Sequence, residues 1–348
     1  MSQKVTQPLP DWRRAWCGAE TATAARIREH AADFQVREIL DYEFSGDGEH
    51  DYLLLEKTGA NTAWAAEQLA AHAGIEPRNV GFAGMKDRHS ISRQWFSVQR
   101  TAAVADWSQF SVPGLRVIEC ARHRRKLRRG AHSGNRFRIA MRGAGKESAT
   151  VSDRLLGIRS RGVPNYFGEQ RFGRAAGNIE LARQLFRGRR LSRQKRSLAL
   201  SAARAWIFNH ILASRVENGS WDRLLPGDCA SLDGSGSFFP VEEPDAALEE
   251  RVRSLDLHPS GAMWGKGQYA CGGEVAALER SMAERFDELS AGLEKFTDQS
   301  RRSLRLAVRQ FEWAWDMDTL WLEFTLTRGG YATAVLREIA DYADAAAA

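Results

Sequence analysis

Alternating apolar and polar residues predict strands between residues 33 and 142. We predict strands at six segments, 33–40, 51–59, 79–84, 93–99, 115–123 and 135–142, of which 33–40 and 135–142 alternate and 79–84 is a short apolar run. In the last segment Phe137, Ile139 and Met141 share one face, and the arginines between and beside them take the other. We expect 51–59 to pair with 33–40.

Spacing of three and four residues between apolar positions predicts helices at 62–73, 178–188 and 196–219. Asn61 is a suitable N-cap for the first helix, because its side chain can accept a backbone hydrogen bond. In the third helix an apolar face begins at Leu198 and continues for four turns.

The last third of the chain changes character twice. Residues 227–245 are rich in Gly, Ser, Asp and Pro, which is typical of loops. Segments 306–315 and 320–327 alternate again and predict a hairpin, and 331–342 predicts a closing helix. Strand-rich ends around a helix-rich middle indicate one domain interrupted by another.

The composition narrows the class of protein. The 348 residues predict two domains, and 43% apolar with 27% charged residues is typical of globular chains. Four cysteines without a CxxC pair favour free thiols over a disulfide framework or a zinc site. We find neither a signal-peptide core nor an apolar run approaching the roughly 20 residues of a membrane span, so we expect a cytoplasmic protein without membrane contact.

Basic residues are concentrated in two runs without acids, although the net charge is only +6. Residues 122–142 contain nine Arg or Lys, and residues 183–196 contain seven. Aromatic residues lie close by, as in "GVPNYFGEQRFGR" (162–174), and this mixture favours binding of RNA over DNA. The alternative is a solvated charged face. The candidate RNA contacts are Arg122, Arg124, Arg125, Lys126, Arg128, Arg129 and Arg171.

One loop carries candidate chemistry. In "GFAGMKDRHSISRQWF" Asp87 stands among Lys86, Arg88 and His89, which we expect to favour its ionised form. The alternative is an ordinary turn residue. The chain has no hydrolase elbow, P-loop, zincin or EF-hand pattern, so Asp87 is the best candidate for a nucleophile or base.

Five segments resemble the tRNA pseudouridine synthase D (TruD) family, in the family's order. They are "VGFAGMKDRHSISRQWF", "ARHRRKLRRGAHSGNRF", "GVPNYFGEQRFG", "KRSLALSAARAWIFNHI" and "GGYATAVLRE". The resemblance implies an α+β fold: a circularly permuted pseudouridine synthase domain with a mixed, mainly antiparallel sheet and helices, interrupted by a helix-rich TRUD domain. The expected bounds are 1–159 with 308–348 for the catalytic domain and 160–307 for the insertion.

The resemblance also implies an activity: uridine 13 in the D-arm of tRNA becomes pseudouridine, with Asp87 as the catalytic aspartate. The flipped base needs a stacking ring, and Phe137 with Asn135 matches the family's base-contacting pair. Lys86 belongs to the same "KD" motif as Asp87. Arg28 stands where the family often has lysine, and Tyr331 where phenylalanine is common.

The expected partner is tRNA, and we expect a monomer that uses no metal and no other cofactor. An ionised Asp87 could add to C1′ of the ribose or remove the 2′ proton, and both routes stay open. One alternative function is a non-catalytic tRNA-binding protein or RNA chaperone. A metal-dependent nuclease would need several converging carboxylates, which the motifs do not provide.

Overall fold

The computed structural model describes residues 12–17, 24–101 and 104–347 of the chain. These residues divide between two compact units, which we call the helical unit and the sheet unit. The helical unit comprises Met1–Glu20, Asp153–Ala307 and Gly330–Ile339, and the sheet unit comprises Thr21–Ser152, Val308–Gly329 and Ala340–Ala348.

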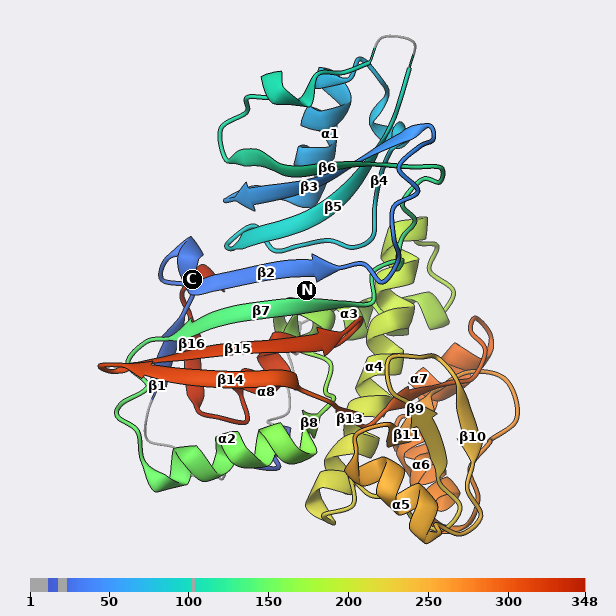
Figure 1. Ribbon diagram of the computed structural model, residues 1–348. Coiled ribbons are helices and arrows are strands. Elements are labelled where there is room, and N and C mark those ends of the chain that lie inside the picture. Colours follow the sequence, from blue (N-terminus) through green and yellow to red (C-terminus); the bar gives the residue numbers. More distant parts are fainter. Residues whose placement is uncertain (1–11, 18–23, 102–103, 348) are drawn as a thin grey trace, which may run out of the picture. The chain divides into compact units, whose positions relative to one another are not determined.

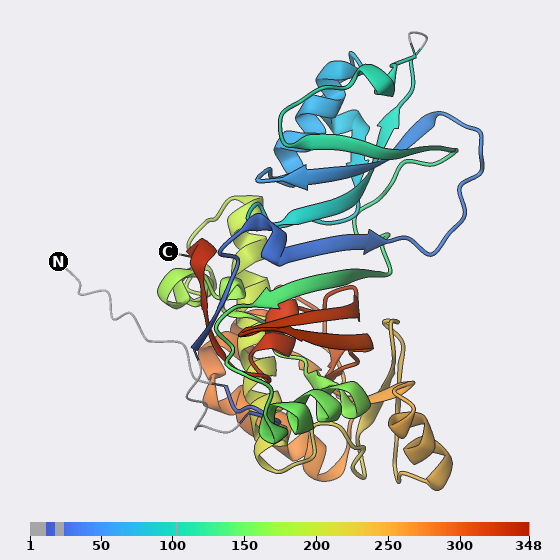
Figure 2. The ribbon, with the colours of Figure 1, turned by 60° about the vertical axis from the view of Figure 1, so that its left-hand side comes forward.

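The sheet unit is built on an eight-stranded sheet (Figure 1), and Figure 2 shows its twist from the red strands β14 and β15 to the teal strand β6. The strand order is β14-β15-β7-β2-β5-β3-β6, and β4 also pairs with β5. The strands are β2 (Phe34–Ile39), β3 (His50–Thr58), β4 (Val80–Phe82), β5 (Ile91–Gln99), β6 (Leu115–His123), β7 (Gly134–Met141), β14 (Arg309–Asp316) and β15 (Thr319–Thr327).

The strand pairing confirms most of the expected strands but corrects one neighbour. β2 and β5 pair in parallel over three residue pairs, and the other described pairs of this sheet are antiparallel. β5 lies between β2 and β3, so the expected pairing of 51–59 with 33–40 is wrong. The physical reason is that β3 is buried on both faces and takes β5 and β6 as its neighbours.

Helix α1 (Thr62–His72) covers part of this sheet and confirms the expected helix. The Asn61 side chain accepts a hydrogen bond from the Trp64 amide at 2.7 Å and caps the first turn. Leu69 packs with Leu53 and Phe96 in the core beneath the helix. Local capping and tertiary burial therefore agree here.

The C-terminal segment departs from the expected closing helix at 331–342. The hairpin of β14 and β15 is confirmed, but α8 (Ala332–Leu336), which belongs to the helical unit, is only five residues long. The chain then forms β16 (Asp341–Asp344), which pairs in parallel with β1 (Ala24–Ile27) in the sheet unit. Pairing with a strand far away in sequence overrides the local helical pattern.

The helical unit is built around α4, which contacts α3, α6, α7 and β11 (Figure 1). A four-stranded sheet has the order β10-β9-β11-β12, and β13 pairs with β8. The helix α2 (Ala149–Arg161) begins in the sheet unit and ends in the helical unit. The other elements are β8 (Val163–Pro164), α3 (Gly177–Phe186), α4 (Arg193–Glu217), β9 (Cys229–Leu232), β10 (Phe238–Pro240), α5 (Ala246–Arg253), β11 (Leu257–Met263), α6 (Gly273–Arg285), α7 (Asp287–Glu294), β12 (Ser300–Ser303) and β13 (Arg305–Leu306).

Two expectations for this unit need correction. Leu198 is 43% exposed, so the apolar face of α4 begins one residue later, at the buried Ala199. The segment 227–245 is not all loop, because β9 and β10 form a short antiparallel pair within it. Mixed helices and mainly antiparallel sheets confirm the α+β fold class.

Candidate active site

Asp87 lies in the loop between β4 and β5, within the sheet unit. Its Oδ1 accepts a hydrogen bond from the His89 amide at 3.1 Å, and the Ser90 hydroxyl donates to its backbone carbonyl at 2.9 Å. These local bonds hold the loop in a tight turn. The Asp87 side chain is 32% exposed, so a ligand can reach it.

The cation that pairs with Asp87 is Arg28. The distance from Arg28 Nη2 to Asp87 Oδ2 is 3.1 Å, and Nη1 of the same guanidinium lies 2.5 Å from the Asp344 carboxylate. The guanidinium centre also lies 4.2 Å from the centroid of the Phe34 ring. Arg28 therefore bridges two carboxylates while packed on an aromatic ring.

Arg28 has an unusual backbone and an unused donor. Its φ of 59° is left-handed, a conformation that costs a non-glycine residue about 1–3 kcal/mol and persists only where its surroundings hold it. Its side chain is 6% exposed, and its buried Nε has no hydrogen-bond partner among the described residues.

Lys86 points to a different carboxylate. Its ammonium lies 2.9 Å from Glu38 Oε2, and the side chains of the pair are 7% and 0% exposed. Glu38 Oε1 also accepts the Trp95 amide at 3.3 Å, beyond the last residue pair of β2 and β5. Burial raises the pKa of Glu38, although the charge of Lys86 opposes that rise. The pair fastens the loop that carries Asp87 to the sheet.

These contacts correct the expected surroundings of Asp87. Arg88 donates to the Gly59 carbonyl, and His89 contributes its backbone amide. Neither side chain, nor that of Lys86, forms an ion pair with Asp87 among the described residues, and Lys86 pairs with Glu38 instead.

Two basic groups near the loop, the buried Lys57 and the half-buried His132, were not among the expected site residues. Burial, followed by the charge of Lys86, lowers the pKa of Lys57 to about 8, and its ammonium donates to the Ala60 carbonyl at 3.0 Å. Burial, and then Lys86 and Arg328, lower the pKa of His132 to about 4, so its imidazole is neutral at pH 7. The buried Nδ1 of His132 has no partner among the described residues. Both residues read as ordinary strand or loop positions in the sequence.

Asn135 and Phe137 lie on the face of β7 that also presents Glu38 of β2, since Asn135 pairs with Glu38 in register. The buried Oδ1 of Asn135 has no partner among the described residues. Phe137 is 8% exposed, and its ring centroid lies 6.1 Å from that of Phe34 and 5.4 Å from that of Phe324. Phe137 is therefore part of the core as well as a candidate site residue.

Two expected site residues belong to the helical unit. Tyr331 precedes α8, and its hydroxyl accepts a hydrogen bond from Arg171 Nη2. Arg171 also donates to the Ser201 hydroxyl at 3.0 Å, and Phe167 lies beside both residues. The structure thus brings Arg171 and Tyr331 together, whereas Asp87 belongs to the sheet unit.

The basic residues from Arg122 to Arg129, which we call the arginine run, are all exposed. Arg124 forms two hydrogen bonds to Asp47, at 2.9 and 2.8 Å. The Arg129 guanidinium lies 3.8 Å from the centroid of the Phe82 ring. Apart from Arg124, no member of the run has an acidic partner in the described part of the chain, so most of its positive charge is available to a ligand.

The described residues contain no group of three or more His, Cys, Asp or Glu arranged to hold a metal ion. None of the helices described is long and apolar enough to span a membrane.

Comparison with known proteins gives consistent matches over most of the chain. Residues 14–189 and 187–339 match the family model for tRNA pseudouridine synthase D (TruD). A tRNA pseudouridine synthase D from Methylococcus capsulatus is 44% identical, over 93% of both chains. Another, from Xanthomonas campestris pv. campestris, is 43% identical over 94% of both. The crystal structure of a candidate tRNA pseudouridine synthase D from Methanosarcina mazei has the same fold, with a TM-score of 0.73, 21% identity and coverage of 92% of this chain and 94% of that one.

Proposed function

The chain belongs to the tRNA pseudouridine synthase D family, and we propose that it converts uridine 13 in the D-arm of tRNA to pseudouridine, with Asp87 as the catalytic carboxylate. One observation carries the assignment to Asp87. Its carboxylate is accessible, yet fixed by a turn on one oxygen and by the buried Arg28 on the other. A reactive group held in this way needs little reorganisation before it meets its substrate.

The proposed reaction is an isomerisation, so it requires a reactive group on the protein but no co-substrate. The bond between N1 of the uracil and C1′ of the ribose breaks, a bond from C5 to C1′ forms, N1 gains a proton and C5 loses one. No atom is gained or lost overall. Ionised Asp87 can add to C1′ or take the 2′ proton, and Arg28 stabilises the anion that either route requires. We propose that neither a metal nor an organic cofactor takes part.

The target base has to leave its stack to reach Asp87. We propose that Asn135 and Phe137 hold it. The unpaired Asn135 Oδ1 is a buried acceptor that the uracil edge can satisfy, and the Phe137 ring shares the same face of β7. Lys86 acts indirectly, because its ammonium is committed to Glu38.

The remaining assignments are proposals of the same kind. We assign catalysis to 1–159 and 308–348, and the TRUD insertion to 160–307. The arginine run and Arg171 bind tRNA phosphates, and Tyr331 contacts the substrate. The protein acts as a monomer.

The decisive experiment uses purified protein, chelator-treated buffer and a tRNA transcript labelled with tritium at C5 of uridine. Pseudouridine formation releases the label, and sequencing locates the product. We expect the wild type to release tritium from position 13 and Asp87→Asn to release none. Asp87→Asn should bind tRNA as tightly as the wild type. The matched control is Asp106→Asn, because Asp106 also accepts a backbone amide within a turn but lies outside the site.

Each other outcome contradicts a part of the proposal. Binding without release by the wild type would indicate a tRNA-binding protein or RNA chaperone. Release by Asp87→Asn would move the chemistry to another residue. Product at another nucleotide would overturn position 13 alone.

A further inference from the structure

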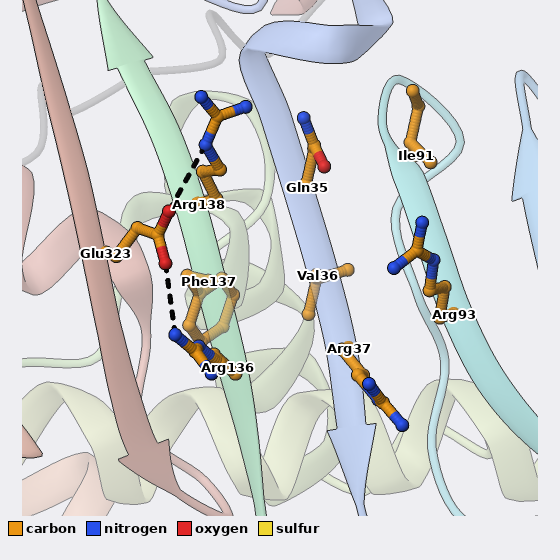
Figure 3. A pocket seen from close by; sticks show the side chains of 9 residues that line it. All are labelled: Gln35, Val36, Arg37, Ile91, Arg93, Arg136, Phe137, Arg138 and Glu323. Carbon is orange, nitrogen blue, oxygen red and sulfur yellow. Dashed lines mark hydrogen bonds and ion pairs between the residues drawn. The ribbon is translucent and has the colours of Figure 1, made fainter. Parts of the chain in front are cut away.

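The face of the sheet that carries the β7 arginines has a hollow (Figure 3), and of the residues that line it only Phe137 has a role in the proposed mechanism. Successive side chains of a strand point to opposite faces, so β7 presents Arg136 and Arg138 here. The hollow has a volume of about 190 Å³. Its polar side chains, which we call the arginine groove, are those of Gln35, Arg37, Arg93, Arg136, Arg138 and Glu323.

Within the arginine groove one carboxylate serves two arginines. Glu323 Oε2 lies 3.1 Å from Arg136 Nη2, and Glu323 Oε1 lies 3.3 Å from Arg138 Nε. The side chains of both arginines are about half exposed, at 54% and 47%. A single negative charge cannot neutralise two guanidiniums, so this edge of the groove stays cationic.

The opposite edge of the groove is cationic for a different reason. Arg93 pairs at 2.9 Å with Glu56, a carboxylate outside the groove that Arg116 shares at 2.7 Å. Arg37, between Arg93 and the β7 arginines, has no hydrogen-bond or ion-pair partner among the described residues, and it is exposed. Four arginines and one acid thus line a single hollow, whereas a merely solvated face would spread or balance its charges.

A second hollow continues from the first. It has a volume of about 420 Å³ and shares Arg37 and Arg136 with the arginine groove. The acids in its wall are Glu119 and Glu38, of which Glu38 is paired with Lys86. Its aromatic residues are Tyr42, Phe44 and Trp95.

Tyr42 joins this second hollow to the arginine run. Tyr42 is 36% exposed, and its ring centroid lies 5.4 Å from that of His123, which stands between Arg122 and Arg124. Positive charge therefore extends from the arginine run to the face of the sheet that carries the arginine groove, and the accessible ring of Tyr42 lies between them.

We propose that the arginine groove binds phosphates of an unpaired RNA segment of the substrate tRNA, away from the target nucleotide, and that a base of this segment stacks on Tyr42. The inference rests on the proposed function, which supplies tRNA as the ligand. Guanidiniums that track a backbone beside an exposed ring are the combination that binds single-stranded RNA. An acidic protein segment would use the charges but has no base to stack on the ring.

The test measures tRNA affinity against salt concentration for Arg37→Ala and for Arg37→Ala with Arg138→Ala. Arg37 suits this test because its removal leaves no carboxylate without a partner. Each lost phosphate contact should flatten the slope of log affinity against log salt by about 0.7 for a single strand. The matched control is Arg116→Ala, which lies on the same face but outside the groove. Thermal melts confirm that each variant is folded.

Further readouts separate the groove from the catalytic site. At saturating tRNA the single-turnover rate of the groove variants should equal that of the wild type. Tyr42→Ala should weaken binding, and Tyr42→Phe should restore it. Groove variants that match Arg116→Ala in slope and affinity would overturn the proposal. Polyglutamate that displaces tRNA as well as an unpaired oligonucleotide of equal charge would replace RNA by an acidic protein partner.

The two proposals can fail separately. A wild type that forms no pseudouridine, while the groove variants still flatten the slope, would refute the enzyme assignment and leave the groove standing. A wild type that modifies tRNA while the groove variants bind normally would refute the groove alone.

Discussion

Arg28 and Asp87 form an ion pair of 3.1 Å although they come from separate segments of the chain, and the second terminal nitrogen of Arg28 is committed to Asp344. Because Asp344 fixes the guanidinium from one side, the other side is presented to Asp87 in a defined orientation. The C-terminal strand β16 thus helps to orient the partner of Asp87 through Asp344 and Arg28.

We expect Arg28→Lys to slow single-turnover modification about tenfold and Arg28→Met about a hundredfold, which correspond to about 1.4 and 3 kcal/mol. A lysine ammonium carries the charge but lacks the fork that meets both carboxylates. Affinity for tRNA should stay the same in both variants, as measured by binding at equilibrium. A normal rate for Arg28→Met would show that Asp87 needs no cationic partner.

Two substitutions of Phe137 separate its contribution to core packing from its proposed role as a stacking surface for the base. Phe137→Leu keeps an apolar side chain and should cost less than about 1.5 kcal/mol of stability, but it loses the stacking surface and should slow modification about ten- to a hundredfold. Phe137→Ala should additionally destabilise the protein by about 3–5 kcal/mol, because the ring is buried against Phe34 and Phe324. Thermal melts and single-turnover rates report the two effects.

The control for Phe137 is Phe96→Leu, a fully buried ring in the core beneath α1. It should lose a similar amount of stability and keep its activity. If Phe137→Leu modifies tRNA at the wild-type rate, Phe137 belongs to the core alone.

We predict that substitutions in the arginine run weaken the dependence of tRNA affinity on salt concentration. No acidic partner is found among the described residues for Arg125, Lys126 or Arg128. Replacing all three by Ala should therefore flatten the slope of log tRNA affinity against log salt concentration by about 2 units. Arg251→Ala with Arg253→Ala is the control, because both arginines pair with acids on α5 or beside it. An unchanged slope would favour a solvated charged face.

The lowered pKa of Lys57 predicts that the free energy of unfolding changes with pH in the alkaline range. Burial lowers its pKa from 10.5 to about 8, so between these values the unfolded chain binds a proton that the folded chain lacks. The free energy of unfolding therefore rises with pH in this window, by up to about 3 kcal/mol. The stability of the wild type relative to Lys57→Met should rise accordingly from pH 8 to 10.5.

Chemical denaturation at several pH values measures this difference, and groups common to both proteins cancel. Lys146→Met, at an exposed lysine of the same unit, should show a constant difference from the wild type. A constant difference for Lys57→Met as well would mean that Lys57 titrates normally in the folded state.

The sequence by itself determined the elements whose stability is local. The Asn61 cap defined the start of α1, and the two-residue alternation in 135–142 separated Phe137 from its neighbouring arginines. The motifs around Asp87 and Phe137 also indicated the family. These features are determined within one element or one motif, so short-range patterns suffice to predict them.

Only the tertiary structure decided which distant segments meet. The position of β5 between β2 and β3, the pairing of β16 with β1 and the burial of Lys57 beside the Asp87 loop all depend on contacts across the chain. Alternation shows that Arg136 and Arg138 share a face, but not that Arg37 and Arg93 lie beside them. A period of two or 3.6 residues describes one element, whereas strand order and buried charge result from the balance of packing among all of them.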